Sequence, residues 1–535
     1  MKRVVVLGIA GTALLTAACN GGAPKDSQGA PGAGGSKQVT MAVQSLPDTL
    51  TIAPWGGTPS QLVLSGLGSQ LAAYNGASAN GCGPVTPSAV SGLLADSITV
   101  DPDHKAVTVK LKPLKSQTGN TLSAQDVAWS FVDYGFVAQP VLKKTFAVAG
   151  YDTDHLVTVV DKHTVKLNIK SYNSYTDQML QNPLASVYDS TEAKKHVTSS
   201  DPIAHDWLAK NLADYSGWKL DSFTPGQSLA VVANSDWGGP QRKIDRLALQ
   251  AVPADATRQV LITSGQAQVA SGFQFDQYKT LSADASVKVQ NCPGLNMDDL
   301  MLSTKTPPLD DVRVRQAISM AINRKQIADG AYFGFATPAQ SSFNKGFGLG
   351  TFGDAYTFDV AKAKALLAEA GHPNGFPLTL TYSTSRPGPV AARTAVLLQS
   401  MLKQIGITVT LRPVASPTDF STAVLGGSYQ AVLYGEPPVI ADPAYLAWIK
   451  FGSNSPNNTT GWKNADFDTL RGKLASTPAT DTATRTDLLK KLAEIGDTQV
   501  PVIYLVETSN MVVTAKQTTQ PPLPNGPIRF DGIGS

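Results

Sequence analysis

The sequence is poor in the residue types on which metal and redox chemistry depend. Its 535 residues include only three cysteines and six histidines. Two ligands that share one face of a helix stand three or four positions apart, and no two histidines have that spacing. The histidines are His104, His155, His163, His196, His205 and His372. We therefore expect neither a metal site nor a bound cofactor.

Charge is scarce as well. Charged residues make up 16% of the chain, the net charge is +3, and no basic run marks a face for nucleic acid. The GxxxxGK[ST], GxSxG and HExxH motifs of nucleotide-binding and hydrolytic sites are missing. Two acidic pairs, Asp298-Asp299 and Asp310-Asp311, are interpreted as helix caps or solvated loops. An enzyme is not expected, although a hydrolase built from distant residues stays an alternative.

One long apolar run occurs, and it lies at the start of the chain. Residues 4–16 are about 13 apolar or small residues, fewer than the ~20 that a membrane-spanning helix needs. The basic pair Lys2-Arg3 precedes the run and Ala17-Ala18-Cys19 follows it. This pattern resembles a bacterial lipoprotein signal, which implies that residues 1–18 are removed and that Cys19 is lipidated. The alternative is an ordinary secretory signal that contains a cysteine.

The next segment predicts a flexible tether. Residues 19–38 are rich in Gly, Ala, Pro and Ser, and such a composition cannot bury enough apolar surface to offset the entropy of ordering. With Cys19 lipidated, Cys82 and Cys292 remain in an oxidising compartment, and an even remainder suggests one disulfide. Two buried free thiols are the alternative.

The rest of the chain shows the periodicities of an α/β fold. Ser123 and Asp126 have the spacing of a capping box, and apolar residues follow at helical spacing. Asp311 and Asp359 are predicted to begin two further helices, and Gly371 is predicted to end the second. The stripe from Leu397 to Ile405 predicts another helix. Strands are indicated where apolar and polar residues alternate, at residues 165–169 and 407–411.

Several segments, taken in order, resemble the dipeptide- and oligopeptide-binding proteins of family 5 of the extracellular solute-binding proteins. Each segment alone is weakly diagnostic, but their shared order and spacing make the resemblance strong. They are GNTLSAQDVAWSF at 119–131, VDKHTV at 160–165, NSDWGG at 234–239, PPLDDVRVRQAI at 307–318 with AINR at 321–324, and DVAKAKALLAEAG at 359–371.

The resemblance implies a two-lobed fold of the periplasmic-binding-protein type, with a solute-binding cleft between the lobes. Lobe I is expected at residues 39–289 and 504–535, and lobe II at 290–503. The implied function is that of an extracytoplasmic lipoprotein of an ABC importer. It captures a short peptide, closes around it and delivers it to a permease and ATPase complex. A monomer that touches the membrane through its lipid anchor alone is expected.

The resemblance also places the candidate site residues. Arg386 stands where the family has the arginine that binds the ligand carboxylate. The family's amine-binding Asp lies three residues before an Asp-Pro, and here Val439 precedes Asp442-Pro443 at that distance. Glu436, in the segment that begins at Tyr434, is the nearest acid that could replace it. Tyr434, Val439 and Asp442 are also expected to contact the ligand. In Ala53-Pro54-Trp55, the aromatic residue Trp55 is a candidate for stacking on the ligand.

Because Val439 replaces the expected acid, the nature of the solute stays open. A longer or modified peptide fits, and so does a sugar, an opine or a metal chelate bound by the same fold. A surface enzyme or a signalling lipoprotein without a transport role is the alternative from another class.

Replacing Cys19 by Ser should release the protein from the membrane into the medium, because the modified sulfur is the expected anchor. Fractionation of cells that express the wild type and the variant measures this. A variant that stays in the membrane fraction would show that the lipoprotein interpretation is wrong.

Overall fold

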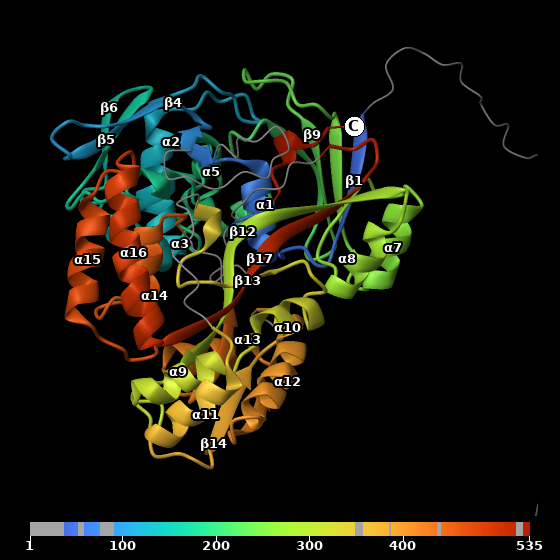
Figure 1. Ribbon diagram of the computed structural model, residues 1–535. Helices are drawn as coiled ribbons and strands as arrows, with labels where there is room; N and C mark the ends of the chain where they lie inside the picture. Colours follow the sequence, from blue (N-terminus) through green and yellow to red (C-terminus); the bar gives the residue numbers. More distant parts are fainter. Residues whose placement is uncertain are drawn as a thin grey trace, which may run out of the picture. The chain divides into compact units, whose positions relative to one another are not determined.

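Two long antiparallel strands connect the two halves of the main sheet in the computed structural model (Figure 1). They are β12 (Val287–Leu302) and β17 (Val502–Ala515), and their register runs from Val287 opposite Ala515 to Met301 opposite Val502. The structure describes residues 37–51, 58–74, 90–347, 357–384, 387–435, 440–519 and 528–534.

Within these residues, the main sheet has eleven strands. Its order is β15-β14-β16-β12-β17-β11-β1-β10-β9-β8, and β13 pairs with β17 outside this path. The strands other than β12 and β17 are β1 (Gln38–Val43), β8 (Trp218–Thr224), β9 (Ser228–Ala233), β10 (Arg246–Ala251), β11 (Val269–Ala270), β13 (Thr337–Pro338), β14 (Pro377–Tyr382), β15 (Thr408–Pro413) and β16 (Ala431–Gly435).

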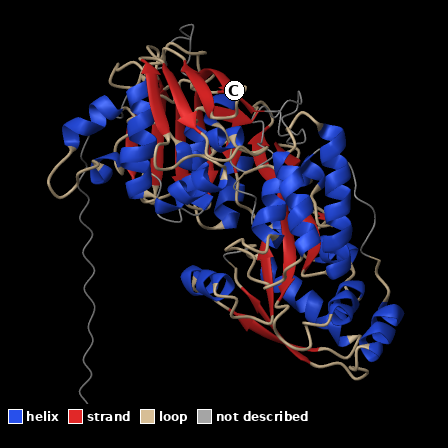
Figure 2. Ribbon diagram, turned by 90° about the vertical axis from the view of Figure 1, so that its left-hand side faces the viewer, coloured by secondary structure: helices blue, strands red, loops and turns tan. Residues whose placement is uncertain are grey.

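Helices cover both faces of the half of the sheet that contains β14, β15 and β16 (Figure 2). Successive strand residues point to opposite faces, so Leu300 and Leu433 enter one core while Met301 and Val432 enter the other. The first core contains α9 (Val312–Met320), α10 (Arg324–Gly330), α11 (Val360–Glu369) and α12 (Val390–Lys403). The second contains α13 (Pro417–Leu425), α14 (Pro443–Phe451), α15 (Ala465–Ser476) and α16 (Thr482–Gln499).

The other half of the sheet has its own cores. Val39, Met41 and Val43 of β1 pack with β9, β10 and α1 (Thr58–Leu67), while Ala42 points to the opposite face. That face is covered by α7 (Asp255–Thr263) and α8 (Phe275–Ser282).

A smaller sheet of four strands is formed by residues 95–168, in the N-terminal part of the sequence. Its strands, in order, are β4 (Ala95–Val100), β5 (Ala106–Leu111), β7 (Thr164–Asn168) and β6 (Val157–Asp161). Helices α15 and α16 are drawn beside this part of the molecule (Figure 1), and the Tyr175 and Tyr445 rings meet edge to face at 5.8 Å. The four-stranded sheet and α14–α16 therefore share one extended apolar core.

The predicted helix starts are confirmed. Asp311 and Asp359 cap α9 and α11, accepting hydrogen bonds from the backbone N–H of Arg313 at 2.8 Å and of Lys362 at 2.9 Å. Gly371 ends α11 with φ +90°, a conformation that favours glycine. The helix expected after Ser123 differs in part. It begins as α2 (Ala124–Ala128) and continues as a π-helical turn over Trp129–Gly135.

Two arginines of the family-like segment attach helices α9 and α10 to the end of α16 and to β17. Arg315 donates to the backbone carbonyls of Gln499, Val500 and Leu309, and Arg324 Nε donates to the Tyr504 carbonyl at 2.7 Å. Both side chains are buried, so these hydrogen bonds satisfy charged groups that have lost their water. Arg315 therefore has a structural role at the start of the helix.

Cys292 lies fully buried in β12 and is disulfide-bonded. Its expected partner, Cys82, lies outside the described residues, as does Cys19, so the pairing stays a prediction. Among the residues that the structure covers, no helix has both the length and the apolar character needed to cross a membrane.

Peptide mapping of unreduced protein should recover Cys82 and Cys292 in one linked peptide. A bond between them closes a loop of about 210 residues and should constrain the unfolded chain by up to ~5 kcal/mol, so reduction should lower the melting temperature. Alkylation of denatured, unreduced protein provides the check. Labels on both Cys82 and Cys292 would rule the bond out.

Candidate functional site

The candidate site is defined by the neighbouring ends of two parallel strands, β14 and β16. Leu380 and Thr381 of β14 pair with Ala431 and Val432 of β16. The carboxyl ends of parallel strands are where open α/β sheets bind ligands, because loops with free polar groups begin there. In the sequence, Arg386 follows the end of β14, and Glu436 and Val439 follow the end of β16.

The residues that flank these two segments are in contact. A Cβ atom built on Gly435 would lie 2.7 Å from the Cβ of Pro387 and 2.1 Å from Oδ1 of Asp298, so this position has room only for glycine. Pro387 directly follows Arg386 in the sequence, and Gly435 directly precedes Glu436. The structure thus brings together the residues next to the two predicted segments. Arg386, Glu436, Val439 and Trp55 themselves lie outside the described residues.

Asp298 supports this junction from β12, where it pairs with Gly435. Its carboxylate is buried. It accepts one hydrogen bond from the Tyr332 hydroxyl and another from Asn296 Nδ2 at 3.0 Å. Burial raises the pKa of Asp298 to about 7, and the neighbouring charge of Asp299 adds to the shift, while the Tyr332 hydrogen bond opposes it. Asp298 therefore changes charge near neutral pH at the base of the candidate site.

Asp299 points to the opposite face of the same strand. It forms a buried ion pair with Lys450, with Oδ2 and Nζ 3.0 Å apart, and among the residues that the structure describes its Oδ1 has no hydrogen-bond partner. Burial raises the pKa of the Asp299 carboxyl, although Lys450 opposes the rise. Lys450 Nζ also lies 4.8 Å from the centre of the Tyr434 ring, within the range of a cation–π interaction.

Tyr434, a predicted ligand residue, thus lies on the face covered by α13 and α14. Its ring is stacked on Phe420 of α13, with the ring centres 6.4 Å apart. Asp442, another predicted ligand residue, is fully buried and caps α14 by accepting from the Ala444 N–H at 2.7 Å. It also pairs with Arg485 at 2.7 Å. Both residues have protein partners, and their contact with a solute stays a prediction.

Sequence reasoning missed the two carboxylates of β12. The interpretation of Asp298 and Asp299 as caps or solvated loops is wrong, because both are buried strand residues. The signal was present in the apolar residues on either side, Leu295, Met297 and Leu300, which are typical of a buried strand rather than a loop. Lys450, by contrast, carried no sequence signal, since its partner is 151 residues away.

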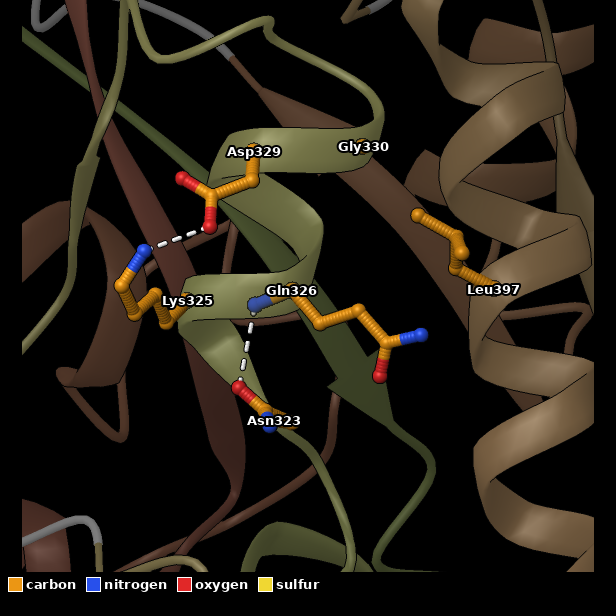
Figure 3. A pocket seen from close by; sticks show the side chains of 6 residues that line it. All are labelled: Asn323, Lys325, Gln326, Asp329, Gly330 and Leu397. Atoms are coloured by element: carbon orange, nitrogen blue, oxygen red, sulfur yellow. Dashed lines mark hydrogen bonds and ion pairs between the residues drawn. The ribbon is translucent and has the colours of Figure 1, made fainter.

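A shallow groove elsewhere on the surface contains none of the predicted site residues. It lies between α10 and α12, and Figure 3 shows Lys325 turned toward Asp329 on its charged side, with Leu397 of α12 opposite. Within the described part of the chain, no group of three or more His, Cys, Asp or Glu residues is arranged to hold a metal ion.

Comparison with known proteins identifies the class. The profile of the family described as bacterial extracellular solute-binding proteins, family 5 (middle region), matches residues 89–458. A curated relative, the probable D,D-dipeptide-binding periplasmic protein DdpA of Escherichia coli, is 26% identical over 434 residues, which cover 80% of this chain and 81% of that protein.

Two solved structures share the fold. The ABC transporter-associated periplasmic binding protein DppA of Helicobacter pylori, in complex with the peptide STSA, has a TM-score of 0.75 and 21% identity, covering 93% of this chain and 98% of the other. MoaA of Agrobacterium tumefaciens, in complex with mannopinic acid, has a TM-score of 0.73 and 22% identity, covering 94% and 99%.

The fold is therefore the two-lobed type of the periplasmic binding proteins, as predicted. The chain belongs to family 5 of the bacterial extracellular solute-binding proteins, whose members are solute-binding transport proteins rather than enzymes.

The stability of the protein should depend on the charge of Asp298. The unfolded carboxyl releases its proton near pH 4 and the folded one near pH 7, so the folded state binds more protons between these values. Stability should thus fall as the pH rises through this window. Between pH 5 and pH 8, the wild type should lose about 2–3 kcal/mol relative to Asp298→Asn.

Urea unfolding at several pH values measures the difference, with Asp310→Asn as the matched control because Asp310 is exposed. Tyr332, Asp299 and Lys450, which also act on the pKa of Asp298, are unchanged in both variants. Parallel stability profiles for the wild type and Asp298→Asn would contradict the assignment of a pKa near 7.

Proposed function

We propose that this chain is the peptide-capturing subunit of an ABC importer on the outer face of the cell membrane. It holds a short peptide between two lobes, and a permease and ATPase complex takes the peptide up. The observation that carries the proposal is the contact of Pro387 with Gly435 at the ends of β14 and β16. In a family of solute-binding proteins, this junction lies next to both segments that are expected to bind the charged ends of the ligand.

Arg386 is the proposed partner of the ligand's negative group. A charged group that enters a closed cleft loses its water, and desolvation costs several kcal/mol unless an opposite charge compensates. At the other end, Val439 offers no charge to a free α-amine. Glu436 is then the proposed substitute, with the two prolines that follow it in the sequence restricting where it can reach. Trp55 is proposed to stack on the ligand.

The relatives support a peptide ligand without defining its length. One is named for D,D-dipeptide binding, and a structural neighbour was solved with the peptide STSA. A non-peptide solute is the second candidate, and two observations favour it. Val439 stands in place of the amine-binding Asp, and a neighbour of the same fold is bound to mannopinic acid.

The remaining elements of the proposal concern location and assembly. Cys19 carries the lipid anchor, and residues 19–38 form the tether that leaves the folded part mobile above the membrane. The lobes divide near residues 289–290 and 503–504, within the two strands β12 and β17. The protein acts as a monomer.

A native mass spectrum of the protein purified from its own cells is the test of the solute class. We expect a retained mass that fragments into amino-acid residues. A sugar acid or a metal chelate in its place would select the second candidate.

Arg386→Ala should weaken binding of the native ligand by roughly 30-fold or more, because a lost charge-assisted hydrogen bond in a closed cleft costs ~2–5 kcal/mol. Val439→Asp should strengthen binding of free dipeptides, and Glu436→Gln should weaken it if Glu436 holds the amine. Calorimetry with a panel of small peptides measures all three variants.

Arg412→Ala is the matched control, since Arg412 is an exposed residue of β15. If Arg386→Ala binds the native ligand as tightly as this control, the proposed site is misplaced, although membership of the family is unaffected.

A further inference from the structure

A buried ion pair holds the three helices that precede β17 together. Asp442 and Arg485 are 2.7 Å apart, and both side chains are almost completely buried. Asp442 caps α14, while Arg485, in the first turn of α16, donates to the carbonyls of Leu474 at 3.3 Å and Thr477 at 3.1 Å, at the end of α15. A buried pair is favourable only when its remaining hydrogen-bonding capacity is satisfied, because both ions have lost their water.

The groups that complete this environment come from the other half of the chain. Ser174 Oγ lies 3.4 Å from Oδ1 and 3.5 Å from Oδ2 of Asp442, and Gln178 Nε2 lies 3.5 Å from Oδ2. The backbone N–H of Ser174 donates to the carbonyl of Ala475 in α15 at 2.7 Å. The side-chain contacts are long, so each is weak alone. Together with Tyr175 on Tyr445, they exclude water from the pair.

The segment that carries Ser174 is fixed to its own half of the molecule. Thr176 Oγ1 donates to the carbonyl of Ala149 at 2.8 Å, and the Thr176 carbonyl accepts from the Tyr151 hydroxyl at 2.9 Å. Residues 172–178 therefore move with the four-stranded sheet. The field of Asp442 reaches across the contact, because burial and then the charge of Asp442 raise the pKa of Asp177 to about 6.

From these contacts we infer that residues 172–178 and the Asp442–Arg485 pair form a closure latch, in which Ser174 and Gln178 cover the ion pair only while the two lobes are shut. When the lobes separate, water replaces the two donors and hydrates Asp442. The latch thus sets the balance between open and closed forms before any solute binds. This inference rests on the proposed function, since a solute-binding protein traps its ligand by closing.

A second contact across the halves has a different character. Arg393 of α12 and Asp276 of α8 are 3.3 Å apart, but both side chains are substantially exposed. Water and salt screen exposed pairs, which contribute little to stability. The exposed pair therefore contributes less than the buried latch and the apolar core around it.

The test removes the two donors and keeps the ion pair. In the ligand-free Ser174→Ala/Gln178→Ala variant, the Ser174 position keeps its backbone N–H, whose exchange with deuterium reports opening of the bond to Ala475. We expect this amide to exchange about tenfold faster than in the wild type, while the Asn168 amide of β7 is unchanged. Ser171→Ala/Gln404→Ala is the matched control, because both residues are exposed.

Affinity for tri-alanine, used as the peptide probe, should fall about tenfold in the same variant, through faster dissociation. Circular dichroism melting verifies that the variant is folded. Unchanged exchange at residue 174 would overturn the latch. If tri-alanine does not bind even the wild type, the proposed recognition of a short unmodified peptide is wrong, and the ligand-free exchange measurement still decides the latch.

Discussion

The pairing of β12 with β17 is the constraint on which the rest of the molecule depends. These two strands lie at the centre of the sheet. Each pairs with a further strand at one end, and β13 pairs with the middle of β17. The last residues of β12 pair with β16, and the last residues of β17 pair with β11. Arg324 attaches α10 to β17, and Arg315 attaches α9 to the end of α16, which leads into β17. The candidate site at the ends of β14 and β16 is therefore positioned by strands that also belong to the other half.

The pairing is not uniform along its length. Its register shifts between Pro293 and Met297, close to the disulfide-bonded Cys292, and again at Asp298 and Asp299. Bulges of this kind bend strands and redirect side chains. Here the second shift coincides with two buried carboxylates that point to opposite faces, each with different partners. Buried carboxylates lower the stability of a strand core, and such local losses of stability are typical of functional regions.

Much of the local structure could be predicted because it depends on neighbours in the sequence. Asp311 and Asp359 cap helices through residues two or three positions away, and Gly371 supplies a conformation that its own lack of a side chain permits. The family-like segments likewise predicted the fold. The candidate site was different, because its contacts join distant residues. No periodicity connects Lys450 to Asp299 or Ser174 to Asp442, and polar strand residues such as Asp298 look like loop residues until their partners are known.

The glycine at position 435 has a consequence for how the protein can change over evolutionary time. Its backbone lies directly against Asp298 and Pro387, so position 435 tolerates little substitution. The two predicted ligand segments, residues 385–386 and 436–439, adjoin this junction in the sequence. If these segments meet the solute as proposed, substitutions within them change the chemistry of binding while the framework is inherited unchanged. Two same-fold proteins solved with a peptide and with mannopinic acid are what such a separation would produce.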